Sequence, residues 1–344
     1  MRLPMPRGPL SSGLCAVLGG DDARLPEVEA DAGRLAGDPP ADVLGDEDVQ
    51  LSLLVLYELH YQGFEGVDPD HEWSPELLSV RRVLERLLEG ALRSQMPMPA
   101  LPCPTAPAVA DALATLTAGD DGPSLSAFLA RRASVGQFRE FLVHRSVYQL
   151  KEADPHTWAL PRLTGRAKAA LVEVQMDEYG GGRLDRMHSV LFAGSMRALG
   201  LDHTYGAHLD RVPAVTLATV NAMSFFGLHR RLRGAVVGHL AAYEMTSTVP
   251  NRRYGAGLRR LGFGPDATCF FDEHVEADAV HEQIAAHDMC GGLVEDEPEL
   301  LPDVLLGAAT AVELDRRFAE HVLAAWSARR GSLREVGVSA RRLG

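Results

Sequence analysis

The 344-residue sequence is 46% hydrophobic and 24% charged, a balance typical of soluble globular proteins with a substantial buried core. Aromatic residues make up only 6%, so the core depends on Leu, Val and Ala, a mix that favours helices over a β-sandwich. The formal net charge of −13 repels phosphate backbones, and we therefore expect no nucleic-acid partner.

The N-terminus and the cysteines indicate the compartment. The first residues contain only a short apolar stretch broken by Gly and Pro, whereas a signal peptide or a membrane span needs a continuous apolar run. The cysteines are scattered without a CxxC pair, which is typical of a reducing cytoplasm and gives no thiolate metal site. We expect a cytoplasmic protein that does not contact a membrane.

Four regions follow one another along the chain. Residues 1–45 are rich in Gly, Pro and Asp without apolar periodicity, and they predict a mobile arm. Residues 46–95 show two amphipathic patterns and predict an N-terminal helical region. Residues 96–120 predict a proline-rich linker and a short helix, and residues 121–335 predict the main domain.

Helical spacing recurs through most of the chain and is interrupted by glycine and proline. The sequence predicts helices at about 46–64, 74–94, 109–118, 124–132, 134–153, 165–182, 186–200, 213–247 (in two pieces), 251–262, 270–290 and 298–329. No alternating strand pattern and no internal repeat is present in the sequence. The predicted fold class is therefore all-α.

The clearest chemical signal is the spacing of His274, Asp278 and His281. On a helix these positions fall within an arc of about 60°, so the three side chains project from one face. Two imidazoles and a carboxylate on one face suit iron, manganese or zinc. Because further glutamates make this helix acidic, a solvated stripe is the alternative interpretation.

Three further candidates lie upstream. Glu244 is in an apolar helical pattern, where a metal ion is one of the few partners that stabilise a buried carboxylate; a bond to a core arginine or serine is the alternative. Glu178 and His188 diverge by about 80° on a regular helix, so a shared site requires unwinding at Gly180–Gly182. Carboxylates and histidines converging from separate helices can hold two iron ions, although the Glu-x-x-His motifs of ferritin-like proteins are absent.

The stretches EYGGG…MHSVLF, GLHRRLRGAVVGHLAAYEMTS and FFDEHVEADAVHEQ resemble the haem-oxygenase-like di-iron oxidases, a family of iron-containing redox enzymes. The likeness extends over about residues 125–330 and is closest to members with an N-oxygenating central domain. It implies a haem-oxygenase-like helical bundle with an N-terminal helical extension. The ligands that it implies for two iron ions are Glu178, His188, Glu244, His274, Asp278 and His281.

The same resemblance implies further features. An additional carboxylate on the preceding helix of N-oxygenating members matches Glu152 of this chain, and residues 46–95 resemble their dimerisation segment, which implies a homodimer. Those members also carry a C-terminal cupin domain for N-nitrosation. This chain ends at Gly344 without one, so an N-nitroso product is not expected.

The resemblance implies an O₂-dependent non-haem di-iron N-oxygenase. Such an enzyme uses two Fe(II)/Fe(III) ions, O₂ as co-substrate and an external electron donor. It would convert a small-molecule amine or guanidine to a hydroxylamine and, with further turnovers, to a nitro group. Two alternatives stay open: a di-iron oxidase that desaturates or cleaves C–C bonds of a carboxylic or amino acid, and a helical bundle that binds a small molecule without redox chemistry.

Groups that bind the substrate are harder to recognise. Arg230, Arg231 and Arg233 form a basic cluster that could clamp a substrate carboxylate, although such runs are more often solvated. The loop 203–208, with two histidines and a tyrosine, could line a pocket or be purely structural. Asp177 points about 100° away from Glu178 and is expected at the surface or behind the ligands.

Overall fold

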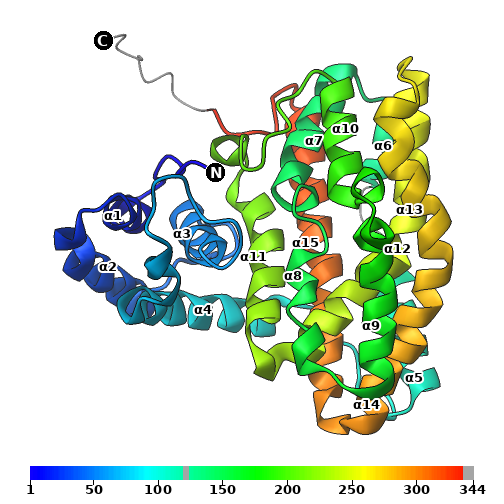
Figure 1. Ribbon diagram of the computed structural model, residues 1–344, viewed down its shortest axis with the longest axis horizontal. Coiled ribbons are helices and arrows are strands. Elements are labelled where there is room, and N and C mark those ends of the chain that lie inside the picture. The colour runs from blue at the N-terminus through cyan, green and yellow to red at the C-terminus, as the bar shows by residue number, and fades with distance from the viewer. Residues whose placement is uncertain (119–123, 336–344) are drawn as a thin grey trace.

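The computed structural model describes residues 1–118 and 124–335, except for the side chains of residues 276–280, and consists of helices and their connections (Figure 1). No β-strand occurs in these ranges, so the predicted all-α class is confirmed. No helix within the same ranges combines the length and the apolar character needed to cross a bilayer.

The chain forms a succession of α-helices joined mostly by short turns. In order these are α1 (Pro9–Leu18), α2 (Leu25–Gly37), α3 (Glu47–Glu58), α4 (Pro75–Gln95), α5 (Ala106–Ala118), α6 (Leu125–Arg131), α7 (Val135–Gln149), α8 (Asp154–Thr157), α9 (Gly165–Glu178), α10 (His188–Ala198), α11 (Ala214–Leu228), α12 (Arg233–Arg260), α13 (Pro265–Gln283), α14 (Gly292–Asp296) and α15 (Leu301–Ser327). A π-helical segment, η8 (Ile284–Gly291), follows α13 directly. Such segments interrupt the regular hydrogen-bond ladder and are frequent near functional sites.

Polar side chains fix where several helices begin. The Asp46 carboxylate accepts a hydrogen bond from the backbone N–H of Val49 at 2.8 Å and so caps the start of α3. At the start of α7, the Ser134 hydroxyl accepts from the N–H of Gln137, whose side-chain oxygen accepts from the N–H of Ser134. This reciprocal pair stabilises the first turn of the helix that leads to the candidate site.

Helices α12 and α15 form the centre of the main domain, with α13 against α12 and α11 against α15 (Figure 1). Two glycines allow α12 and α15 to approach closely. A Cβ on Gly238 would overlap the carbonyl oxygen of Val304, and a Cβ on Gly307 would overlap that of Ala235. The two backbones therefore touch where only glycine fits.

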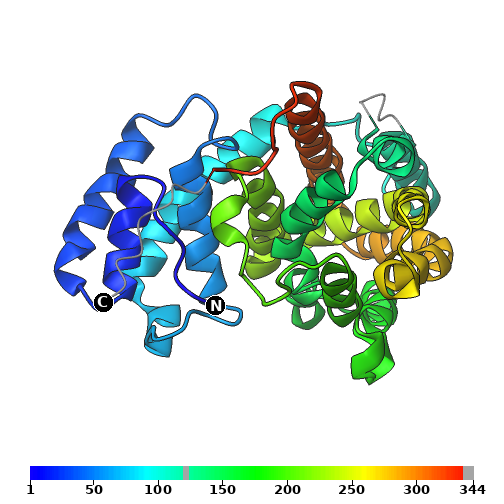
Figure 2. The same cartoon turned by 90° about the horizontal axis from the view of Figure 1, so that it is seen from above.

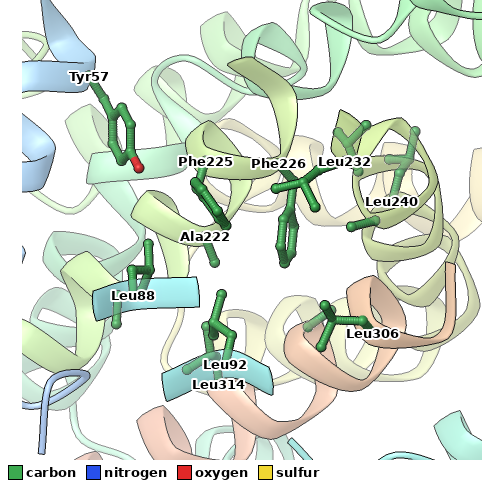
Figure 3. Packing of buried hydrophobic residues seen from close by; sticks show 14 of the residues in the cluster. Tyr57, Leu88, Leu92, Ala222, Phe225, Phe226, Leu232, Leu240, Leu306 and Leu314 are labelled. Carbon is green, nitrogen blue, oxygen red and sulfur yellow. The ribbon is translucent and has the colours of Figure 1, made fainter. Parts of the chain in front are cut away.

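A buried apolar cluster joins the N-terminal helices to the bundle. Figure 3 shows side chains of this cluster from α3, α4, α11, α12 and α15, including Tyr57, Leu88, Leu92, Phe225, Phe226, Leu240, Leu306 and Leu314. Helix α3 packs on α11, and α4 reaches α15. The predicted helical region 46–95 is thus part of the same core as the main domain.

Residues 1–45, expected to be a mobile arm, instead form α1 and α2, which pack beside α3 and α4 at one end of the molecule (Figure 2). Leu10, Leu14 and Val17 are buried at helical spacing. A Cβ on Gly13 would lie 2.6 Å from Cγ2 of Val28 on α2. The glycine therefore serves close helix packing, which corrects the expectation of an arm.

Two helix boundaries in the main domain also differ from the predicted ones. Helix α12 continues through Pro250, where a break was expected. Pro250 cannot donate a backbone hydrogen bond to Thr246, but α13 and α15 pack against α12 and hold it as one helix. Helix α7 ends at Gln149, so Glu152 lies in the turn that follows it.

Candidate metal centre

Glu178 and His188 come together because the chain unwinds between them. Glu178 is the last residue of α9, and His188 is the first of α10. The intervening Gly180–Gly182 segment has φ angles of 64°, 61° and 78°, and a side chain on its first glycine would collide with the backbone of Arg186. Glycine permits this left-handed path, which leaves Oε2 of Glu178 2.9 Å from Nδ1 of His188.

His274 of α13 and Glu152 of the turn after α7 lie beside this pair. The His274 Nδ1–H donates to the Phe270 carbonyl, one helical turn earlier, at 2.8 Å. This bond orients the ring so that Nε2 faces Glu152, with Oε1 at 3.6 Å. The rings of His188 and His274 have centroids 4.3 Å apart.

These four side chains form a compact buried group. One potential ligand atom from each of Glu152, Glu178, His188 and His274 lies within 4.8 Å of all the others. The second oxygen of Glu152 is buried without a hydrogen-bond partner in the part of the chain that the structure describes. A buried carboxylate without a partner is costly, and this oxygen–nitrogen donor set suits iron or manganese.

A second pair involves His281, which lies about two turns after His274 on α13. Nδ1 of His281 is 3.3 Å from Oε2 of Glu244 on α12, and both side chains are buried. The other ring nitrogen, Nε2, is 2.9 Å from Oδ2 of Asp177, whose side chain is 57% exposed. Asp177 was expected at the surface or behind the ligands, and it is both exposed and in contact with the second ring nitrogen of His281.

Asp278 lies on α13 between the two histidines. Its side chain is outside the described residues, so its role as a ligand stays a prediction. The other six candidate ligands come from α9, α10, α12, α13 and the turn after α7, and the structure brings them into two adjoining groups.

Electrostatic interactions connect the two groups through Glu178. Burial raises the pKa of Glu178, but the charge of His188 and smaller contributions from His274 and His281 lower it to about 2. Burial lowers the pKa of His281, whereas Glu244 and then Asp177 raise it to about 9. In the absence of metal, His281 therefore holds a proton against Glu244 at neutral pH, and a bound cation would replace that proton.

A pocket of about 740 Å³ opens beside both groups. Its wall includes Glu152, Glu178, Glu244 and His274, and its size suits a small molecule. The stretch of α12 around Pro250 also lines it.

Two amides in the pocket wall were not singled out from the sequence. Gln175 is 3% exposed, and neither of its side-chain polar atoms has a hydrogen-bond partner among the described residues. Oε1 of Gln149 is likewise buried without such a partner. Unpaired buried amides are rare in folded proteins and are expected where a ligand supplies the missing bonds.

Arg145 places a guanidinium group in the pocket wall. Its guanidinium is 2.6 Å from Asp315 and lies 4.8 Å from the ring centroid of Phe318. Arg145 and Gln149 precede Glu152 by seven and three residues, and Gln175 precedes Glu178 by three. This helical spacing from a predicted ligand was the signal that could have identified them.

The basic cluster suggested by the sequence is not part of this pocket. Arg231 forms an ion pair with Glu89 at 2.6 Å, Arg233 pairs with Glu297, and none of Arg230, Arg231 and Arg233 lines the cavity. Arg231 and Arg233 are engaged in ion pairs outside the pocket, which corrects the hypothesis of a substrate clamp.

The loop 203–208 does not line the pocket either. The Tyr205 hydroxyl donates to Glu58, and His208 hydrogen-bonds the backbone carbonyl of Asp202. Of the two interpretations of this loop, lining the pocket or a purely structural role, these contacts support the structural role.

A helical bundle that gathers buried carboxylates and imidazoles beside a cavity defines a metal-dependent class of protein. Residues 139–316 match the family of iron-containing redox enzymes, a range that covers just over half of the chain and includes every candidate ligand. The chain belongs to this family, and its fold is the haem-oxygenase-like helical bundle.

One curated relative is nitrosourea synthase of Streptomyces achromogenes subsp. streptozoticus. It is 28% identical to this chain over 199 residues, which is 57% of this chain and 42% of the relative. The chain thus spans less than half the length of that relative.

Proposed function

We propose that this protein is a non-haem di-iron oxygenase that uses O₂ to N-oxygenate a small-molecule amine or guanidine. The observation that carries this proposal is the buried group of Glu152, Glu178, His188 and His274, with ligand atoms within 4.8 Å of one another. Family membership supports iron as the metal and redox chemistry as the outcome. It also disfavours a bundle that only binds a small molecule.

The side chains support two adjoining metal positions. Glu152, His188 and His274 would hold one ion, and Glu244 and His281, with Asp278, would hold the other. Glu178 interacts electrostatically with histidines of both groups, as a shared carboxylate would. Two iron ions, when bound, supply the activation of O₂ and the electrons for its reduction, while the protein positions them and the substrate.

The pocket supports a nitrogen-containing substrate. Carboxylates of Glu152, Glu178 and Glu244 line it, and the carbonyl oxygens of Gln149 and Gln175 can accept hydrogen bonds from substrate N–H groups. The relative's name describes a product with an oxidised nitrogen, a nitrosourea. Both observations favour oxidation at nitrogen over desaturation or C–C cleavage, which the same centre could perform.

The oxygenation cycle requires an external reductant as a partner. We also propose that the protein forms a homodimer through residues 46–95 and is located in the cytoplasm. The dimer can be checked by sedimentation of the full chain.

The test of N-oxygenation uses protein loaded with Fe(II) without oxygen. O₂ is then admitted together with an amine, a guanidine or a carboxylic acid that lacks a reactive nitrogen, and the consumption of O₂ and the product mass are measured. We expect faster consumption with an amine or guanidine and a product heavier by one oxygen atom.

Acceleration by the nitrogen-free acid alone would contradict N-oxygenation and select the carbon-oxidising alternative. Absence of iron-dependent O₂ consumption with every compound would contradict both redox functions. Glu244→Gln is the control protein, because it keeps the shape of the side chain and removes a proposed ligand charge.

A further inference from the structure

A buried ion pair joins the N-terminal helices to the turn that carries Glu152. Nζ of Lys151 lies 2.9 Å from Oε2 of Glu58, and the two side chains are only 2% and 1% exposed. Glu58 is the last residue of α3, whereas Lys151 immediately precedes Glu152 in the chain. The pair therefore connects a helix outside the family-matched range with a candidate metal ligand.

Other polar groups complete this network. The Tyr205 hydroxyl donates to Oε1 and Oε2 of Glu58, at 2.8 and 2.7 Å. The Gln62 N–H donates to the same Oε1 atom at 3.3 Å. The Lys151 ammonium lies 4.0 Å from the ring centroid of Tyr61. Because burying two charges costs about as much as their attraction returns, stability alone explains such a pair poorly. The pair is more informative about the position of Lys151, which its geometry fixes.

The turn that carries Glu152 needs support from outside. Helix α7 has already ended at Gln149, and Ala153 has a φ of 75°, a left-handed conformation that is unfavourable for a non-glycine residue. Consecutive side chains in such a turn diverge. With Lys151 held by Glu58, the backbone is fixed so that Glu152 faces His274.

The same turn is tied on its other side. The Tyr179 hydroxyl donates to Oδ1 of Asp154 at 2.8 Å, and Tyr179 directly follows Glu178. The turn is therefore held between the N-terminal helices and the end of α9, where a second candidate ligand lies.

We propose that Glu58, Lys151 and Tyr205 are positioning residues, through which the N-terminal helices set the affinity of the metal ion bound by Glu152 and His274. This role rests on the metal centre proposed above but not on the identity of the substrate. Loss of groups that orient metal ligands typically weakens metal binding about 10- to 100-fold. We expect a loss of that size at one of the two ions.

The experiment replaces both charges by apolar side chains, in the double variant Glu58→Leu/Lys151→Met. This change leaves no unpaired buried charge, so the fold is expected to survive. Binding of Mn(II) to the full chain is followed by the EPR signal of the free ion, and stability is measured by urea denaturation. The variant is expected to bind one ion more weakly at nearly unchanged stability, and Glu152→Gln is expected to do the same.

The matched control is Arg7→Met/Glu47→Leu, which removes another ion pair of the N-terminal region, at 2.6 Å, away from the turn. It should bind both ions as the unaltered protein does. Wild-type affinity in the Glu58/Lys151 variant, or equal weakening in the control, would overturn the positioning role. If the first variant does not fold, Tyr205→Phe decides: weaker binding of one ion supports the role, and unchanged binding contradicts it. Failure of the unaltered chain to bind Mn(II) or Fe(II) would instead remove the metal centre itself.

Discussion

Nδ1 of His281 lies 3.3 Å from Oε2 of Glu244, across the contact between α13 and α12. The two residues are 37 positions apart in the sequence. His281 stands out there by its helical spacing from His274, and Glu244 by its apolar surroundings. Had His281 faced solvent or Glu244 lain elsewhere, a shared metal centre would have been impossible. Their proximity makes ligand substitution the first test.

His281→Ala and Glu244→Ala should each lower oxygen-dependent turnover by at least about 100-fold, because each removes a direct ligand where loss of an orienting group alone costs about 10- to 100-fold. The helical content should stay near that of the unaltered protein, since neither side chain belongs to the apolar core. Turnover and far-ultraviolet circular dichroism are measured on the same preparations. Full activity in both variants would remove these residues from the site.

Metal binding should make α13 more rigid. Its ligands His274 and His281 must be held against α12 and α10, and binding free energy of this kind is coupled to local folding. Hydrogen exchange of peptides covering residues 265–291 should slow when Fe(II) or Mn(II) is added without oxygen. At a metal concentration about 100 times the dissociation constant, the whole protein should gain about 2.7 kcal/mol. Identical exchange with and without metal would argue against this coupling.

Gly238→Ala should destabilise the protein by about 1–3 kcal/mol, because the added methyl group overlaps the backbone of α15. Urea denaturation gives the change in the free energy of unfolding. Gly90→Ala is the control, since Gly90 is exposed within α4 and a Cβ there meets no atom within 4 Å. That variant should be neutral or more stable by up to about 1 kcal/mol. Equal effects of the two substitutions would contradict the close approach of α12 and α15.

The buried histidine His144 predicts loss of stability in mild acid. Burial lowers its pKa to about 3, and its ring nitrogens hydrogen-bond Thr216 and Ser332. Between about pH 6.5 and 3 the unfolded chain takes up a proton at this residue and the folded chain does not, so its contribution to stability is lost as the pH falls. The slope approaches about 1.4 kcal/mol per pH unit.

His144→Gln removes this titration and should flatten the dependence of the unfolding free energy on pH between about 4 and 6. Burial lowers the pKa of His156 to about 4, so part of the dependence should remain. An unchanged slope in His144→Gln would show that this histidine is protonated in the folded protein.

Much of the candidate site could be predicted from helical geometry. The positions of His274 and His281 on one face of a helix depend only on local spacing, which the sequence displays directly. The approach of Glu178 and His188 depended on unwinding at three glycines, also a local property. Glu152 was different, because it lies in a turn after α7 and only the family resemblance pointed to it.

The features that were missed depend on contacts between distant segments. The composition of residues 1–45 suggested an arm and Pro250 suggested a helix break, but packing of α1 on α2, and of α13 and α15 on α12, maintains helices there. Gln175 was marked in the sequence only by its helical spacing from Glu178, and the burial of its amide beside the pocket depends on the fold. Tertiary packing outweighs local propensity at such positions.

The most direct test of the central claim is the number and environment of iron ions in the full chain. Protein loaded with ⁵⁷Fe(II) without oxygen, freed of excess metal and then exposed to O₂ is examined by metal analysis and Mössbauer spectroscopy. Two ions per chain that become magnetically coupled on oxidation are expected, with one ion or fewer in His281→Ala. A single uncoupled iron, or none, in the unaltered protein would contradict a di-iron centre built from these helices.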